Sequence, residues 1–319
     1  MTPVFDLEEK YSLRDTIGQY MKKLGGENEK VLVVNADLMG TCRNRSFVEA
    51  FPDRAFNVGI AEQNLVSFSA GLAHEGFIPF AFTMAPFMSM RACEQCRTDI
   101  AYPGLNVRLV AAYAGVSGGI SGPTHWGIED CGIMCSMPNM TVIEVSDPVQ
   151  AEQVLSASLS YEGPIYIRNG IVPTFRIHGD DYQYRIGRAD VIVDGDDGAI
   201  ICSGTVVQYA VLASLEIRKT CKKQVRVIDM HTIKPIDKEA IIKAAKATGT
   251  IMTVEDHNIL GGLGSIVADV LMEAGVPARL KKLGVPDCFA EPGYPEELYP
   301  YYGLDIDGIV KSAKEFLGK

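Results

Sequence analysis

Short, continuous apolar runs alternate along the chain with longer segments whose apolar residues recur every three or four positions. A continuous run such as Val-Leu-Val-Val at 31–34 is typical of a parallel strand buried on both faces, and the longer segments have helical periodicity. The alternation predicts an α/β fold, with a parallel sheet covered by helices on both faces. We expect strands at 31–34, 77–82, 107–113, 140–144 and 164–168, and helices at 5–24, 85–100, 130–136 and 148–161.

The same alternation is repeated after a break. Residues 169–187 lose their periodicity and carry Pro173, Gly179 and a polar cluster, so we place an interdomain linker there. The second set has strands near 199–203, 224–229, 249–254 and 279–283, and helices near 206–219, 236–247, 262–275 and 306–317. The sequence therefore predicts two α/β domains, 1–180 and 188–319, and 319 residues are enough for each to bury its own core.

Composition limits the classes of function. A hydrophobic content of 47% with 22% charged residues is ordinary for a globular protein. The net charge of −10, without a dense basic run, argues against nucleic acid and anionic membranes as partners. The first residues show no signal pattern and no apolar run is long enough to span a bilayer, so we expect a cytoplasmic protein.

The eight cysteines do not suggest a metal site. They are scattered, and without an export signal we expect them to be reduced. Cys93 and Cys96 alone have the spacing of a redox or zinc motif, but they fall within an expected helix and no second pair completes a site. We therefore expect no metal ligands in this chain.

One acidic residue, Glu62, stands between two apolar segments. The stretch 57–64, Asn-Val-Gly-Ile-Ala-Glu-Gln-Asn, predicts a short strand that turns into a helix at Glu62. The carboxylate could simply complement the helix dipole in the first turn. A carboxylate held among apolar residues could instead be kept for proton chemistry. The stretch alone leaves both interpretations open.

Other candidate residues follow predicted strands. Asp37 lies just beyond the strand at 31–34, where open α/β sheets place ligands. A glycine-rich loop, 115–125, follows the strand at 107–113 and ends in Thr124 and His125, as is typical of a backbone that approaches a ligand closely. The Gly-Gly-Leu-Gly at 261–264 lacks the six-residue spacing of a dinucleotide-binding motif.

Four stretches, 57–64, 80–91, 122–125 and 254–264, together resemble the C-terminal half of transketolase. Transketolase is the thiamine-diphosphate enzyme that moves two-carbon ketol units between sugars. The resemblance covers nearly the whole chain, in order and spacing. It implies a first domain that binds the aminopyrimidine ring of the cofactor and a smaller C-terminal α/β domain.

The resemblance implies roles for three residues toward the cofactor. Glu62 falls on the glutamate that bonds the pyrimidine nitrogen and so helps to deprotonate the thiazolium carbon, which needs a proton shared between a buried carboxyl and a weak base. Phe87 falls on the aromatic residue that stacks on the ring. Met84 and Met90 stand where transketolases often carry further aromatics, so we expect a softer pocket, with Met84 among the cofactor contacts.

Further roles implied by the resemblance concern the substrate. His125, in Gly-Pro-Thr-His, corresponds to the histidine that contacts substrate oxygens and assists proton transfer. Asp37 aligns with an aspartate that lines the thiazolium and substrate region.

The resemblance also implies a phosphate site. Arg14, Thr41 and Arg168 fall where the family binds the phosphate of sugar phosphates, and arginine suits a phosphate because its planar fork gives paired charge-assisted bonds. Ser121 replaces an acidic residue of the family and Tyr113 a histidine. Both departures bear on the identity of the sugar.

Full-length transketolases carry a further N-terminal domain, whose Gly-Asp-Gly motif and downstream asparagine hold the metal and diphosphate. The Gly-Asp-Asp-Gly at 195–198 lies in the second domain and lacks that context. We therefore expect one subunit of a split transketolase that acts on sugar phosphates. Its separate N-terminal subunit would hold the diphosphate with Mg²⁺ or Ca²⁺, in a heterotetramer with sites between chains.

Three alternatives remain. The β subunit of a 2-oxoacid dehydrogenase uses a similar two-domain half, and a deoxyxylulose-phosphate synthase has a similar histidine motif. A catalytically silent α/β regulatory subunit is the alternative from another class of protein. The Gly-Pro-Thr-His motif and the arginine set favour transketolase.

Overall fold

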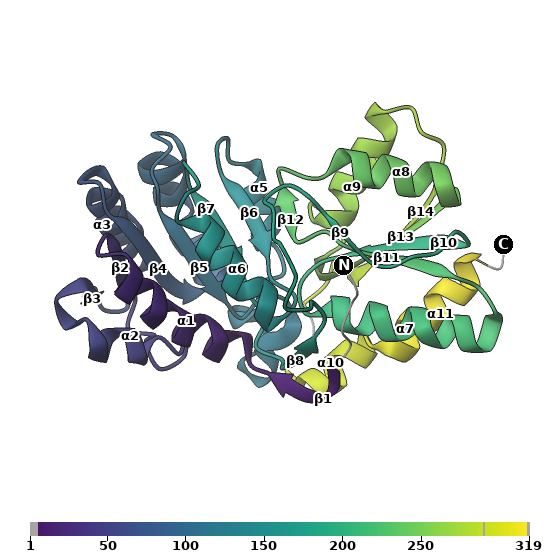
Figure 1. Ribbon diagram of the computed structural model, residues 1–319, viewed down its shortest axis with the longest axis horizontal. Coiled ribbons are helices and arrows are strands. Elements are labelled where there is room, and N and C mark those ends of the chain that lie inside the picture. The colour runs from purple at the N-terminus through teal and green to yellow at the C-terminus, as the bar shows by residue number, and fades with distance from the viewer. Residues whose placement is uncertain (1–5, 290, 318–319) are drawn as a thin grey trace.

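The computed structural model describes residues 6–289 and 291–317. Two α/β domains lie one at each end of its long axis (Figure 1). The first contains a seven-stranded sheet of order β12-β6-β7-β5-β4-β2-β3, in which every neighbouring pair is parallel except β12 with β6. Its strands are β2 (Val31–Asn35), β3 (Ala55–Asn57), β4 (Ile78–Met84), β5 (Arg108–Ala112), β6 (Thr141–Glu144), β7 (Ile165–Arg168) and β12 (Thr232–Lys234).

Helices cover the first sheet, and two of them begin at a capping side chain. Ser12 caps α1 by accepting the Asp15 backbone N–H at 3.3 Å, and Asp147 caps α6 by accepting that of Gln150 at 2.8 Å. The helices are α1 (Leu13–Glu27), α2 (Arg45–Ala50), the 3₁₀ turn η1 (Pro52–Arg54), α3 (Glu62–His74), α5 (Asp130–Ser136) and α6 (Pro148–Ser158).

The segment expected to be one regular helix over 85–100 contains π-helical turns. It consists of η2 (Phe87–Arg91), α4 (Cys93–Gln95) and η3 (Cys96–Ala101), of which η2 and η3 are π-helical. The Ala92 N–H donates to the Phe87 carbonyl at 3.2 Å, five residues back. Such widened turns are rare and are frequent at functional sites.

The second domain is built on a five-stranded sheet of order β14-β13-β10-β11-β9, in which only β9 is antiparallel to its neighbour. Its strands are β9 (Asp190–Val193), β10 (Gly198–Cys202), β11 (Val225–Asp229), β13 (Thr250–Asn258) and β14 (Arg279–Val285). Its helices are α7 (Val206–Cys221), α8 (Lys238–Thr248), α9 (Leu263–Glu273), α10 (Pro295–Tyr301) and α11 (Ile306–Leu317). No helix of 6–289 or 291–317 is both long and apolar enough to cross a bilayer.

The two halves of the chain are interlocked by strands. β12 comes from the second half of the sequence and pairs antiparallel with β6, with Thr232 opposite Ile143. One buried apolar cluster runs from Val34 in β2 to Leu271 in α9, so both domains share it. The second domain is thus held firmly against the first.

The expected helix over 5–24 is wrong in its first part. Residue 5 lies outside the described residues, and β1 (Asp6–Tyr11) pairs antiparallel with β8 (Thr174–Arg176), inside the segment predicted to be an irregular linker. The helix starts only after Ser12. Local periodicity could not reveal this pairing because its two strands lie far apart in sequence.

Candidate active site

Most of the predicted site residues follow the carboxyl ends of neighbouring parallel strands. Asp37 follows β2, Glu62 follows β3, Phe87 follows β4 and His125 lies in the loop after β5. These strands are adjacent in the order β5-β4-β2-β3. The arrangement brings distant segments to one edge of the sheet, where open α/β sheets bind ligands.

Glu62 is buried at the first turn of α3, with only 1% of its side chain exposed. Its Oε2 accepts from Arg91 Nη1 at 2.6 Å, and its Oε1 lies 3.5 Å from the Thr83 hydroxyl. Arg91 comes from the last residue of η2 and keeps 47% of its side chain exposed. The fold therefore holds a buried carboxylate at this edge of the sheet, with one short charge-assisted hydrogen bond.

Phe87 and His125 lie in contact although they belong to different segments. Their ring centroids are 5.2 Å apart, with the planes at 70° in an edge-to-face arrangement. His125 Nδ1 is 2.9 Å from the Thr124 hydroxyl. The predicted stacking aromatic and the predicted substrate histidine thus form one cluster.

Asp37 stands at the edge of the same sheet and is exposed. Its backbone is left-handed, with φ of 58°, and the Asn57 side chain fixes it. Asn57 Oδ1 accepts the Asp37 and Gly59 N–H groups, each at 3.0 Å, and Asn57 Nδ2 donates to Asp37 Oδ1 at 2.9 Å. Met84 is buried at the end of β4, whereas Met90 is exposed.

The structure brings Arg14 and Thr41 together. Arg14 Nη1 donates to the Thr41 carbonyl at 2.8 Å, and its guanidinium carbon lies 5.5 Å from the centre of the Tyr113 ring. Arg14 is half-buried, and its Nε has no hydrogen-bond partner among the described residues. The cavity that Arg14 lines has a volume of only about 10 Å³, so the Nε faces packed side chains.

Arg168 does not lie where a phosphate could reach it. It is fully buried and pairs with Asp130 at 2.9 Å and with Glu144. Its Nη2 donates to the Gly127 and Asp256 carbonyls, both at 2.7 Å. Burial alone would lower the pKa of Arg168, but the two carboxylates outweigh it and hold the pKa above its usual value. Arg168 is a structural cation between the domains, which corrects the predicted phosphate role.

The loop that carries His125 is held by the second domain. The Val116 N–H donates to Asp256 Oδ1 at 2.9 Å, and the Tyr299 hydroxyl donates to Asp256 Oδ2 at 2.6 Å. Gly115 has φ of +61°, and a Cβ there would lie 1.9 Å from the Asp256 Cγ. The loop therefore needs glycine at that point to approach this carboxylate. Sequence reasoning missed Asp256, because nothing local links it to residue 116.

Asp130, Cys131 and His257 form a buried group whose ligand atoms lie within 4.8 Å of one another. The protein already uses two of them. Asp130 accepts from Arg168 and from the Tyr166 hydroxyl at 2.7 Å, and His257 lies between the Gly132 N–H and the Asn258 carbonyl. Burial raises the pKa of the Cys131 thiol. This group is therefore accounted for as packing and does not fit a metal ion.

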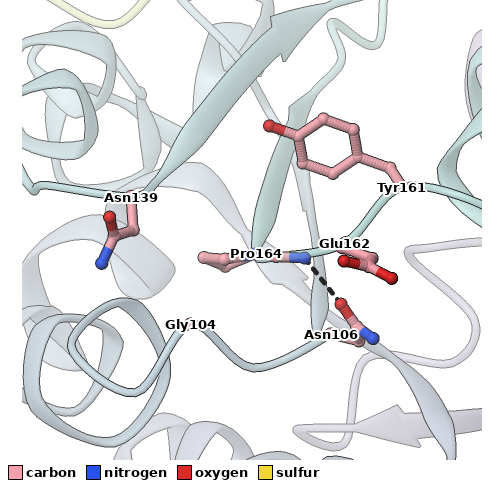
Figure 2. A pocket seen from close by; sticks show the side chains of 7 residues that line it. Gly104, Asn106, Asn139, Tyr161, Glu162 and Pro164 are labelled. Atoms are coloured by element: carbon pink, nitrogen blue, oxygen red, sulfur yellow. Dashed lines mark hydrogen bonds between the residues drawn. The ribbon is translucent and has the colours of Figure 1, made fainter.

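An open pocket lies at the opposite edge of the sheet (Figure 2). Asn106, Asn139 and Pro164 precede β5, β6 and β7, so the pocket is at the amino ends of these strands. The Gly163 N–H donates to Asn106 Oδ1 at 2.6 Å. Because ligands of open α/β sheets bind at the carboxyl ends, we place the active site at the other edge.

Comparison with known proteins identifies the family of the chain. The chain matches the transketolase pyrimidine-binding domain over residues 9–170 and the transketolase C-terminal domain over residues 187–309. It therefore belongs to the transketolase family. The expected fold class, a pyrimidine-binding α/β domain followed by a transketolase C-terminal domain, is confirmed.

The similar proteins include separate C-terminal chains. A putative transketolase C-terminal section from Methanocaldococcus jannaschii is 40% identical over 309 residues, which cover 96% of each chain. A 6-deoxy-6-sulfo-D-fructose transketolase subunit from Clostridium sp. is 36% identical over 307 residues, covering 96% of this chain and 95% of that subunit. A solved split gene transketolase, an inactive β4 tetramer, has a TM-score of 0.86 at 37% identity and covers 97% of this chain and 99% of that chain. The resemblance to the C-terminal part of a split transketolase is confirmed.

Proposed function

We propose that this chain is the pyrimidine-binding subunit of a two-chain transketolase, which transfers a two-carbon ketol unit from a ketose phosphate to an aldose phosphate. The observation that supports this best is the cluster of Glu62, Phe87 and His125 at the carboxyl edge of the sheet. A buried carboxylate beside an aromatic ring suits a flat, weakly basic ring such as the aminopyrimidine of thiamine diphosphate. When bound, this cofactor supplies the carbanion chemistry that the side chains of a protein lack.

Each residue of the cluster has a distinct role in this proposal. Glu62 exchanges a proton with the pyrimidine nitrogen, and its burial keeps water from competing. Phe87 packs against the ring face. His125, in edge contact with Phe87, lies within reach of substrate oxygens and moves protons there.

The diphosphate and its Mg²⁺ or Ca²⁺ belong, in this proposal, to a separate N-terminal subunit. Two such pairs of chains would form a heterotetramer with the active sites between chains. The solved relative that consists of one kind of chain is described as an inactive tetramer, in keeping with a requirement for both chains.

For the substrate, we assign the phosphate to Arg14 with Thr41, and the sugar hydroxyls to Asp37 and His125. Arg14 supplies the positive charge for the phosphate, and its bond to the Thr41 carbonyl holds the two residues together at this end of the site. Tyr113 under the guanidinium shapes this end of the site.

The test is ketol transfer by the assembled two-chain complex, with xylulose 5-phosphate as donor and ribose 5-phosphate as acceptor. Glu62→Gln should lower kcat by roughly 10²–10⁴-fold, because it removes the proton-exchanging group. Glu75→Gln, an exposed residue just after α3, is the matched control and should leave kcat unchanged.

Other outcomes identify the alternatives. Full activity of Glu62→Gln would refute the assignment and point to a catalytically silent subunit. Turnover of a 2-oxoacid with lipoamide would instead indicate a 2-oxoacid dehydrogenase β subunit, and pyruvate consumption a deoxyxylulose-phosphate synthase.

A further inference from the structure

Arg91 contacts both residues that the proposed function assigns to the cofactor ring. Its Nη1 donates to Glu62 Oε2 at 2.6 Å. Its guanidinium carbon lies 4.3 Å from the centre of the Phe87 ring, a cation–π contact. The proposed function assigns no role to Arg91.

The two contacts are of the kinds that a flat nitrogen ring would make in the same place. The guanidinium is planar, donates N–H bonds from its edge and stacks its face on aromatic rings. An aminopyrimidine with a proton on its nitrogen likewise donates from its edge to a carboxylate and packs its face on a phenyl ring. Arg91 and the ring therefore compete for one position between Glu62 and Phe87.

Glu62 needs a partner whenever the ring is not bound. Its side chain is 1% exposed, and the Thr83 hydroxyl at 3.5 Å is at the limit of a hydrogen bond. A buried carboxylate without a counter-charge is costly, so Arg91 offsets a large desolvation penalty.

Arg91 is placed so that it can leave. It ends the π-helical turn η2 at the surface, and 47% of its side chain is exposed although its tip reaches a buried carboxylate. A rotation about its side-chain bonds takes the guanidinium into water, where hydration compensates for most of the free energy of the lost ion pair. Glu62, on the first turn of α3, does not need to move.

We propose that Arg91 is a placeholder for the cofactor ring. It neutralises Glu62 and covers Phe87 in the free subunit, and the aminopyrimidine ring displaces it on binding. The proposal rests on the proposed function, because it takes Glu62 and Phe87 as the ring site. In this proposal Arg91 is a positioning residue that acts through Glu62. Its presence lowers the affinity for the cofactor but keeps the ring site formed in the free subunit.

The test is calorimetric titration of thiamine diphosphate, with saturating Mg²⁺, into the complex of this chain with its N-terminal subunit. Arg91→Met keeps the volume of the stem and removes the competing cation. We expect roughly two- to fivefold tighter binding, the size of a partly exposed ion pair. Arg97→Met is the matched control, an exposed arginine in the same helical segment, and should bind as the wild type.

A second readout separates this role from simple packing. In the isolated subunit, Arg91→Met should lower the thermal midpoint while Arg97→Met does not, because Glu62 loses its counter-charge. If Arg91→Met fails to assemble, Arg91→Lys carries the test: it keeps the charge, loses the planar stack and should bind the cofactor about twofold more tightly.

Weaker or unchanged cofactor binding in the Arg91 variants would overturn the proposal, since Arg91 would then support the bound ring or be remote from it. If the wild-type complex binds thiamine diphosphate and only this expectation fails, the proposed function stands. If the wild-type complex binds none, both fall.

Discussion

Replacing Arg168 by methionine separates a structural role from the phosphate-binding role that sequence resemblance implies. Methionine keeps most of the stem and removes the guanidinium. In the structure this group has no access to solvent and holds the Asp130 and Glu144 carboxylates together with the carbonyls of Gly127 and Asp256. Arg168→Met would leave two buried carboxylates without the cation that they share.

The magnitude follows from the number of charges left behind. Removing one partner of a buried ion pair costs about 3–5 kcal/mol, and here a single cation serves two carboxylates. Each carbonyl that loses its donor adds about 1 kcal/mol or more. Since whole domains are stable by only about 5–15 kcal/mol, we expect the thermal midpoint to fall by at least roughly 5–15 °C.

The assay pairs thermal and urea unfolding, followed by circular dichroism, with steady-state kinetics of the assembled complex. Arg14→Met is the control: this half-buried arginine should change stability by less than about 1 kcal/mol and raise KM for sugar phosphates roughly tenfold or more. An Arg168→Met variant with native stability and a raised KM would refute the reasoning and restore Arg168 as a phosphate ligand.

Two further predictions concern His178, which pairs with carboxylates, and the buried carboxylate of Asp256. Burial alone would lower the pKa of His178, but the carboxylates of Asp147 and Asp190, 3.1 and 3.7 Å from its ring nitrogens, raise the pKa to about 10. The stabilisation is therefore full below about pH 6.5 and lost as pH rises through 10. His178→Gln should lose about 3–5 kcal/mol at pH 7 and much less at pH 10 in urea unfolding, and an equal loss at both would contradict this. Asp256→Asn leaves one acceptor oxygen for two donors, the Tyr299 hydroxyl and the Val116 N–H, and so weakens the attachment of the loop that carries His125. We expect kcat to fall about tenfold and the affinity for thiamine diphosphate to stay unchanged. A loss of cofactor binding would contradict the view that Asp256 acts by positioning the loop of His125.

The strongest local patterns of the sequence correspond closely to the structure. The continuous apolar run at 31–34 is β2, the helix expected at 130–136 is α5, and α3 begins at Glu62 itself. These elements could be predicted because period and capping are properties of neighbouring residues. The gathering of Asp37, Glu62 and Phe87 at one edge follows from the same patterns, since parallel strands place their carboxyl ends together.

The spacing of Arg91 from Phe87 in the sequence already indicates that the two side chains are neighbours. Arg91 lies four residues after Phe87 in the quoted stretch 80–91, so a helical turn already places the two side chains on one face. The π-helical turn and the burial of Glu62 then decide that its guanidinium reaches the carboxylate.

By itself, the sequence determined the class of fold, the two α/β halves and the candidate residues that follow each strand. Only the tertiary structure decided which polar residues face a site and which neutralise one another. Arg168 and Arg14 both fall at phosphate-binding positions of the family, but Arg168 is enclosed between Asp130 and Glu144, whereas Arg14 lies half-buried beside Tyr113. The physical reason is that charge pairing and desolvation depend on contacts between residues far apart in the chain, such as Asp256 with Val116, which local periodicity does not encode.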